Sequence, residues 1–285
     1  MGGVREGGVV TVAGALVEAM AALGAAGIAD SRFEARLLIQ HVLGLERGAV
    51  LDRAAILDGA ALRMLVVRRA AHEPMALILG RQGFWTLDLE VSGATLIPRA
   101  DSETIVEAAL ATSPGADSVL DLGTGTGCLL LAVLSELPGA WGLGVDRSAA
   151  AVALAARNAV ANGLAARAFF VCSDWAAPIR GRFALIHANP PYVESQAIAG
   201  LMPEVAKFEP ISALDGGRDG LDAYRALMPG VAASLAPGGA VVLEIGAGQR
   251  APVTAIAAGQ GLFVAEVRAD LAGIPRAMVL RAGQP

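Results

Sequence analysis

Cysteine and histidine are scarce in this sequence, and their scarcity excludes several kinds of site. The 285 residues include two cysteines, Cys128 and Cys172, and three scattered histidines, His41, His72 and His187. None of their spacings matches a zinc or haem ligand set. Two cysteines in a chain of this length provide no disulfide framework, which favours a reducing compartment. We therefore expect no metal site and a cytoplasmic protein.

Basic residues are also few for a protein that would bind nucleic acid. Lys207 is the only lysine, and the formal net charge is −5. Broad phosphate binding depends on clustered lysine and arginine side chains. The charge balance therefore disfavours direct contact with nucleic acid.

No apolar run is long enough for a membrane span, although 55% of the residues are hydrophobic. A span needs roughly 20 uninterrupted apolar residues. The apolar stretch 9–29 is interrupted by Glu18, and Leu16, Met20 and Leu23 recur in it at helical spacing. We expect this stretch to form an amphipathic helix of a protein without membrane contact.

The first part of the chain has the patterns of a small helical unit. Residues 10–76 indicate helices with short connections, and a capping-box pattern over 31–34 places a helix N-cap at Ser31. A further helix is predicted over 61–72. Residues 82–97 alternate and contain β-formers, which is typical of a hairpin or short strand pair.

Strands and helices alternate from residue 101 onward. The predicted strands are 118–122, a strand ending at Asp146, 168–174, 183–188, 240–245, and two closing strands near 262–268 and 276–281. Helices are predicted between most of them. Such alternation indicates an α/β fold with a doubly wound, mostly parallel sheet and helices on both faces.

A glycine-rich turn follows the first of these strands. Its residues are Gly123, Thr124, Gly125, Thr126 and Gly127. Glycines here permit positive φ and let the backbone approach a ligand closely. A dinucleotide fingerprint is spaced G-x-G-x-x-G, so the G-x-G-x-G spacing disfavours a nicotinamide-dependent dehydrogenase. The spacing is similar to the first motif of class I methyltransferases, and that resemblance assigns these five residues to binding S-adenosylmethionine.

Polar and aromatic side chains also follow the next two strands. Asp146 comes roughly 20 residues after the turn, where an acid meets ribose hydroxyls. Asp174 and Trp175 lie at the tip of the third strand, where such folds hold an adenine. Taken singly, Asp146 could cap the following helix and Trp175 could belong to the core. Their order at successive strand ends favours cofactor binding by Asp146 and Trp175.

The sequence Asn189-Pro190-Pro191-Tyr192 ends the strand predicted at 183–188. The prolines stop the strand because they lack a backbone N–H. The Asn189 Oδ1 and the Pro190 carbonyl can accept hydrogen bonds from the N–H groups of a planar amide or amino group. These hydrogen bonds would direct the lone pair of its nitrogen at a methyl donor. Tyr192 offers a flat face for that group.

We therefore interpret Asn189, Pro190 and Tyr192 as catalytic residues. All four residues of the motif, including Pro191, are predicted to bind substrate, and Asn189 is also predicted to contact the cofactor. The chemistry requires no strong general base, and His187 is expected to pack within its strand.

The Asn-Pro-Pro-Tyr motif is shared by adenine-N6 DNA methyltransferases and glutamine-N5 protein methyltransferases, and the flanking sequence distinguishes them. The stretches that resemble the peptide chain release factor glutamine methyltransferases, the HemK/PrmC family, are 73–85, 95–103, 202–225 and 235–249. The resemblance covers nearly the whole chain. Two residues depart from it: Ala100 replaces a usual second proline, and His187 replaces a usual small residue.

The resemblance implies a seven-stranded, Rossmann-like class I methyltransferase domain at 99–285, a β-hairpin linker at 81–98 and a helical substrate-docking domain at 1–80. It implies methylation of the N5 nitrogen of the glutamine in the Gly-Gly-Gln loop of class I release factors. It also places Arg99 near the cofactor pocket. We expect a monomer.

Two alternatives remain. An adenine-N6 nucleic-acid methyltransferase would need a basic target-recognition region, and residues 1–80 are neither basic nor large enough for one. A sensor or scaffold protein could keep the cofactor fold without turnover, but such a protein would not need the acceptors of Asn189 and Pro190.

Overall fold

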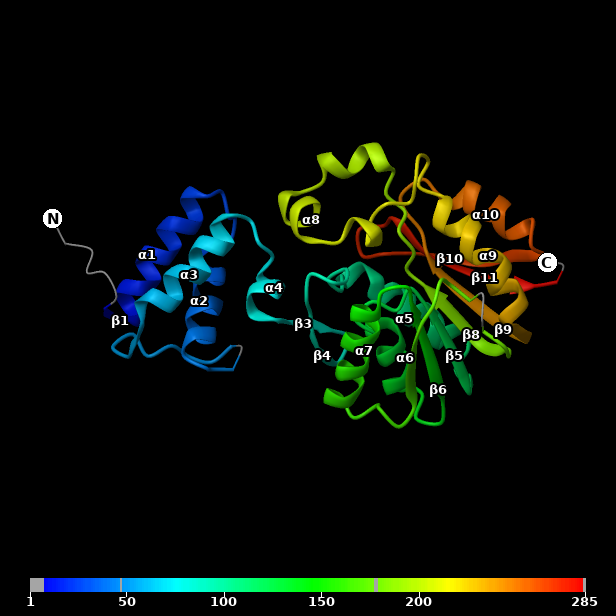
Figure 1. The fold of residues 1–285 in the computed structure, drawn as a ribbon, viewed down its shortest axis with the longest axis horizontal. Helices are drawn as coiled ribbons and strands as arrows, with labels where there is room; N and C mark the ends of the chain where they lie inside the picture. Colours follow the sequence, from blue (N-terminus) through cyan, green and yellow to red (C-terminus); the bar gives the residue numbers. More distant parts are fainter. Residues whose placement is uncertain (1–7, 47, 177–178, 284–285) are drawn as a thin grey trace. The chain divides into compact units, whose positions relative to one another are not determined.

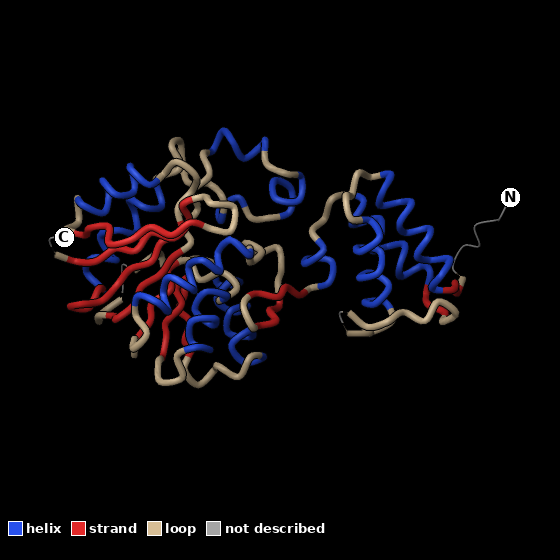
Figure 2. Tube along the Cα trace, turned by 180° about the vertical axis from the view of Figure 1, so that it is seen from behind, coloured by secondary structure: helices blue, strands red, loops and turns tan. Residues whose placement is uncertain are grey.

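The computed structural model describes residues 8–46, 48–176 and 179–283. The chain divides into two compact units, Met1–Gly80 and Arg81–Pro285 (Figures 1 and 2). Residues 1–7, which belong to the predicted docking domain, lie outside the described residues. Each unit has buried apolar clusters of its own.

The first unit is built mainly from helices. They are α1 (Val12–Ala25), α2 (Ser31–Val42), α3 (Gly59–Ala70) and α4 (Met75–Leu79). Leu23, Leu38 and Ile39 are fully buried in their common core. Two three-residue strands that the sequence patterns did not predict, β1 (Val9–Thr11) and β2 (Ile56–Asp58), pair antiparallel.

The start of α2 differs from the prediction. The N-cap is Asp30, whose Oδ1 accepts the Phe33 N–H at 3.3 Å, and Ser31 is the first helical residue. Glu34 instead accepts hydrogen bonds from Arg69 Nε at 2.5 Å and Nη2 at 3.2 Å. The predicted capping box is wrong because aspartate caps a helix as well as serine does, and the glutamate is engaged by a charged partner on α3.

Within the described residues, seven strands of the second unit form one sheet in the order β10-β11-β9-β8-β5-β6-β7. They are β5 (Ser118–Leu122), β6 (Trp141–Asp146), β7 (Ala168–Cys172), β8 (Phe183–Ala188), β9 (Leu235–Glu244), β10 (Leu262–Ala269) and β11 (Pro275–Ala282). β11 runs antiparallel to both of its neighbours, and the other pairs are parallel. The predicted mostly parallel, seven-stranded sheet is confirmed.

Helices cover both faces of this sheet (Figure 1). They are α5 (Glu103–Thr112), α6 (Cys128–Glu136), α7 (Ala149–Ala161), α9 (Asp222–Ser234) and α10 (Arg250–Ala258). β5 is buried along its whole length. Its Val119 packs in the cluster that contains α5 and α6, and its Leu120 packs in the cluster that contains α9 and α10. This division follows from the alternation of side chains along a strand.

Shorter elements complete the second unit. The predicted hairpin is confirmed as β3 (Arg81–Phe84) and β4 (Leu87–Glu90). A 3₁₀ turn, η1 (Ala100–Ser102), precedes α5. Between β8 and α9 lie three elements that the sequence patterns did not predict, η2 (Ser195–Gly200), α8 (Pro203–Phe208) and η3 (Ile211–Ala213). No helix in the described part of the chain has the length and apolar character needed to cross a membrane.

Candidate active site

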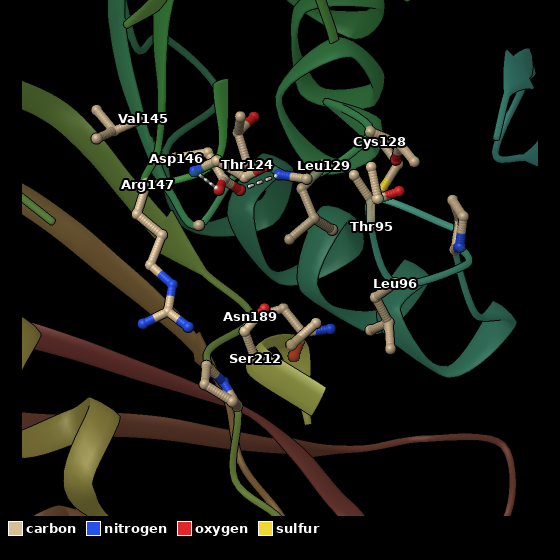
Figure 3. Close-up of a pocket in the computed structure, with 18 of the residues that line it drawn as sticks. Thr95, Leu96, Thr124, Cys128, Leu129, Val145, Asp146, Arg147, Asn189 and Ser212 are labelled. Carbon is tan, nitrogen blue, oxygen red and sulfur yellow. Dashed lines mark hydrogen bonds between the residues drawn. The ribbon is translucent and has the colours of Figure 1, made fainter. Parts of the chain in front are cut away.

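Four adjacent strands, β8, β5, β6 and β7, end at one cleft of the second unit. The lining includes the turn 123–126, Asp146, Trp175 and Asn189, one contribution from the end of each strand. Figure 3 labels Thr124, Asp146 and Asn189 among them. Ligands of doubly wound sheets bind at the carboxyl ends of the strands, where the strand order reverses. That reversal lies here between β5 and β8.

The glycine turn adopts a backbone that only glycine takes without strain. Gly123 and Gly125 have φ of 78° and 56°. A Cβ atom on Gly123 would lie 3.6 Å from Cζ3 of Trp175, so the indole lies directly over the turn. Gly127, with φ of 81°, is not a lining residue; a Cβ there would lie 3.2 Å from the Ala155 Cβ. Gly127 therefore allows α6 to approach α7 closely.

Asp146 holds the turn from the end of β6. Its Oδ2 accepts the Gly125 N–H at 2.9 Å, and its Oδ1 accepts the Ser148 N–H at 2.9 Å (Figure 3). The N-cap of α7 is Ser148, whose Oγ accepts the Ala151 N–H. An ionised carboxylate offers about four acceptor positions. Asp146 is therefore not the helix cap, and it keeps acceptor capacity for a ligand.

The loop after β7 brings Asp174 and Trp175 to the cleft. Trp175 has φ of 47°, in the left-handed region that non-glycine residues rarely adopt. Its ring also packs against the cluster beneath α9 and α10. Strained backbone of this kind concentrates at ligand sites.

The structure separates the residues of the Asn-Pro-Pro-Tyr motif. Asn189 and Pro191 line the cleft, and Pro190 is buried. Tyr192 is half-buried, packs against the cluster beneath α9 and α10, and is not a lining residue. Asn189 is therefore the residue of this motif whose polar side chain faces the cleft (Figure 3).

Asn189 is connected to a buried carboxylate, Glu244, at the end of β9. Asn189 Nδ2 donates to Ser102 Oγ at 3.2 Å, and Ser102 Oγ donates to Glu244 Oε2 at 2.5 Å. The Tyr192 hydroxyl donates to Glu244 Oε1 at 3.0 Å, and Arg276 Nη1 donates to the Tyr192 hydroxyl at 3.4 Å. We call these five residues the Glu244 network.

Burial dominates the electrostatics of this network. Glu244 is 3% exposed, and burial raises its pKa, while the hydrogen bonds from Ser102 and Tyr192 and the charge of Arg276 oppose the rise. Burial, followed by the Glu244 charge, also raises the pKa of Tyr192, which therefore remains a neutral donor. Sequence reasoning missed Ser102 and Glu244. A glutamate inside the apolar run of residues 240–245 was the available signal.

Two residues before η1 add polar groups to the cleft. The Thr95 hydroxyl is buried, and it has no hydrogen-bond partner among the residues that the structure describes. Arg99 lines the cleft and forms an ion pair with Glu209, which follows α8. Burial raises the pKa of Glu209, and the Arg99 charge opposes this rise. The segment between β8 and α9 is thereby connected to the edge of the cleft, which Ser212 also lines.

Other reactive side chains near the cleft are poorly placed for catalysis. His187 is fully buried on β8; its Nε2 lies 3.4 Å from Asp121 Oδ1, but neither ring nitrogen has a hydrogen-bond partner in the described structure. Cys128 lines the cleft, and burial raises its pKa to about 12, which keeps it a thiol. In the described ranges, no three His, Cys, Asp or Glu residues are grouped to hold a metal ion. The polar groups of the cleft can therefore orient a ligand but offer no strong base.

Comparison with solved structures supports the fold. A ribosomal protein L11 methylase from Lactobacillus delbrueckii subsp. bulgaricus has a TM-score of 0.52 at 17% identity, covering 68% of this chain and 84% of that one. A methyltransferase from Pyrococcus furiosus has a TM-score of 0.52 at 18% identity, covering 70% and 90%. At these identities the likeness concerns the fold alone.

Comparison by sequence is more specific. Residues 101–206 match the methyltransferase small domain, and residues 14–80 match the PrmC N-terminal domain. A release factor glutamine methyltransferase from Rhodospirillum rubrum is 50% identical over 261 residues, covering 90% of this chain and 80% of that protein. The one from Bradyrhizobium diazoefficiens is 43% identical over 275 residues, covering 93% of each. The chain therefore belongs to the release factor glutamine methyltransferase family.

Proposed function

We propose that this protein transfers a methyl group from S-adenosylmethionine to the N5 amide nitrogen of the glutamine in the Gly-Gly-Gln loop of class I release factors. The observation that carries the proposal is that the Asn189 carboxamide, the glycine turn and Asp146 line the same cleft. The names of the sequence relatives support the choice of substrate.

The cleft has groups that fit S-adenosylmethionine. Asp146 has free acceptor capacity for the ribose hydroxyls, and Trp175 and Leu129 provide apolar surface for an adenine. The unpartnered, buried Thr95 hydroxyl beside Gly125 needs a polar partner, which a bound ligand would provide. When bound, the cofactor supplies an electrophilic methyl group.

The protein's own part in the reaction is to orient the substrate amide. An amide nitrogen is a weak nucleophile because its lone pair is delocalised into the carbonyl. The Asn189 Oδ1 and the Pro190 carbonyl would accept hydrogen bonds from its two N–H groups and hold the lone pair toward the methyl group. One of the two N–H protons would be lost to water as the N–C bond forms, because an amide protonated on nitrogen is a strong acid and needs no strong base. Such acceptors act without reorganisation, because Asn189 is already held by Ser102.

A release factor loop suits this cleft. Two glycines let an extended backbone carry a single glutamine side chain into a narrow site. The net charge of −5 is compatible with a protein substrate and gives no support to nucleic-acid binding. We also propose that the first unit docks the release factor.

Radiolabelled methyl transfer tests the proposal. We expect label on a class I release factor, and no label on the same factor with Gln→Ala in its Gly-Gly-Gln loop. A single-stranded oligonucleotide that contains adenine tests the alternative substrate in the same assay. Label on the oligonucleotide but not on the release factor would contradict the proposal.

A further inference from the structure

The hydrogen bonds behind Asn189 have a fixed direction. Both oxygens of Glu244 accept hydrogen bonds, from Ser102 and Tyr192, and these bonds together with the charge of Arg276 favour the ionised carboxylate, which can only accept. Ser102 has one hydroxyl proton and donates it to Glu244 Oε2 at 2.5 Å. Its oxygen can then only accept, so the Asn189 group that lies 3.2 Å away must be Nδ2. The Asn189 Oδ1 consequently lies on the side of the planar carboxamide that points away from Ser102.

The second oxygen of Glu244 is fixed in the same way. Arg276 can only donate, and its Nη1 lies 3.4 Å from the Tyr192 hydroxyl. The hydroxyl proton is therefore directed to Glu244 Oε1, at 3.0 Å. Arg276 is itself held by Asp270 Oδ2, at 3.1 and 3.0 Å from its Nε and Nη2. Glu244 thus accepts from the Ser102 hydroxyl, which contacts Asn189, and from the hydroxyl of Tyr192. One buried carboxylate therefore fixes the hydrogen-bond direction at both ends of the Asn-Pro-Pro-Tyr motif.

This direction matters for an amide substrate. A carboxamide that presents Oδ1 accepts the N–H of the incoming glutamine, whereas a reversed one presents its own NH₂ and repels it. We propose that Glu244 is a positioning residue that, through Ser102, fixes the orientation of the Asn189 carboxamide and aims Oδ1 at the substrate nitrogen. Glu244 acts at a distance, since it is not among the residues that line the cleft. The inference rests on the proposed function.

Glu244→Gln changes this direction while keeping the side-chain volume. A glutamine has one acceptor oxygen and one NH₂ group. The Tyr192 hydroxyl accepts from Arg276 and must still donate to residue 244, so the glutamine oxygen faces Tyr192. The NH₂ then faces the Ser102 hydroxyl, which must turn to accept. A Ser102 hydroxyl that turns away from residue 244 donates to Asn189 and favours the reversed carboxamide.

The experiment compares Glu244→Gln, Ser102→Ala and their combination in the full chain, with the matched control Ser118→Ala. Ser118 is also a buried serine, but it lies at the amino end of β5, where its hydroxyl bonds Asp117 and the Ala184 N–H. The measurements are kcat and KM for methyl transfer to release factor, S-adenosylmethionine affinity by calorimetry, and thermal stability.

We expect kcat of Glu244→Gln and of Ser102→Ala to fall about 10- to 100-fold, the range for a misplaced orienting group, with cofactor affinity nearly unchanged. Because both act through Asn189, the double variant should lose little more than the worse single variant. The Ser118→Ala control should keep wild-type kcat. Ser102→Ala keeps the inference testable if Glu244→Gln folds poorly. Wild-type kcat in a folded Glu244→Gln or in Ser102→Ala, or losses that multiply in the double variant, would overturn the inference.

A readout that does not depend on the substrate separates this inference from the proposed function. The Asn189 side-chain NH₂ should give a distinct ¹⁵N–¹H resonance that is slow to exchange in wild type and faster in Glu244→Gln and Ser102→Ala. Unchanged exchange would contradict the positioning role. Failure of the wild-type protein to methylate release factor would instead contradict the proposed function.

Discussion

At the scale of single residues, the carboxylate of Asp146 accepts hydrogen bonds from the protein backbone and can accept further hydrogen bonds from a ligand. Both of its oxygens hold backbone N–H groups, of Gly125 and Ser148, and each keeps a further acceptor position. The residue therefore connects the glycine turn to the start of α7 and leaves lone pairs that face the cleft.

Asp146→Ala is expected to weaken S-adenosylmethionine binding by about 1.5–3 kcal/mol, because a charged acceptor is lost from hydroxyl groups that the cleft encloses. Titration calorimetry measures this change. The control is Ser148→Ala, which removes the real cap of α7, at a cost of about 1 kcal/mol in stability, and leaves the carboxylate in place. Equal affinities in the two variants would mean that Asp146 acts only through the local backbone.

The raised pKa of Glu244 gives a pH dependence. Burial and the nearby Asp101 raise this pKa, while Ser102, Tyr192 and Arg276 oppose the rise. As the pH falls through the raised pKa, the carboxyl gains a proton and can donate to Ser102, so the direction of the network is lost. We expect kcat to decline at a pH above the ordinary glutamate value of 4.5. A pH–rate profile measures the decline, and Glu244→Gln should lack this acid limb; an identical limb in the variant would contradict the assignment.

Residues at strand ends could be predicted from sequence, whereas the groups behind them could not. Asp146 and Asn189 each lie at the end of a short, mostly apolar run. Their place at the carboxyl ends of the strands therefore follows from the parallel topology alone. Ser102 and Glu244 lie 142 positions apart in sequence, and no local pattern relates them. Their contact depends on how η1 meets the end of β9, which only the tertiary structure defines.

At the scale of elements, Gly144 of β6 determines how closely the glycine turn and the Phe170 ring of β7 approach the strand. A Cβ on Gly144 would lie 2.6 Å from Phe170 Cδ1 and 2.7 Å from Thr124 Oγ1. Thr124 in turn donates to Asp121 Oδ2 at 2.6 Å. The strand can therefore support the glycine turn only if it carries no side chain at this position.

Gly144→Ala is expected to lower the free energy of unfolding by about 1–3 kcal/mol, because the added methyl overpacks a closed site. It should also weaken S-adenosylmethionine binding, since Thr124 must move. Urea denaturation and calorimetry measure the two effects. Gly139→Ala is the matched control, because a Cβ there meets no atom of the described residues within 4 Å. Equal stability of the two variants would contradict the packing argument.

The regular elements were easier to predict than the short ones. The strand predicted at 118–122 matches β5 residue for residue, because its apolar run is closed by glycine. β1 and β2 have three residues each, too few for a periodic pattern. The segment between β8 and α9 depends on distant contacts, such as the bridge between Val193 and Asp215, which no local sequence pattern encodes.

At the scale of the whole molecule, the two units have separate cores. The buried members of the first core run from Val12 to Ile78, and those of the second unit run from Phe84 to Leu280. The described residues that line the cleft, from Ala94 to Ala213, all belong to the second unit. The proposed docking role of the first unit can therefore be tested apart from cofactor binding.

Deletion of residues 1–80 is expected to leave S-adenosylmethionine affinity largely intact and to depress methyl transfer to intact release factor. A short peptide that contains Gly-Gly-Gln serves as the control substrate, because it lacks the parts of the release factor that a docking surface on the first unit would bind. Its slow methylation should change little on deletion. Full activity of the truncated protein on intact release factor would contradict the docking role.

In the proposed function the Asn189 carboxamide orients the substrate nitrogen, and single-turnover methylation of release factor at saturating cofactor tests this role. Asn189→Ala removes the acceptor but leaves the prolines and β8 in place. Loss of one preorganised acceptor typically costs about 10²–10³ in rate, and Asn189→Asp should restore it only in part, because its charge must be desolvated. Cofactor affinity should fall much less than the rate, since the other proposed cofactor contacts remain. We expect this large loss of rate in Asn189→Ala; a rate within about threefold of wild type would show that Asn189 does not orient the substrate nitrogen.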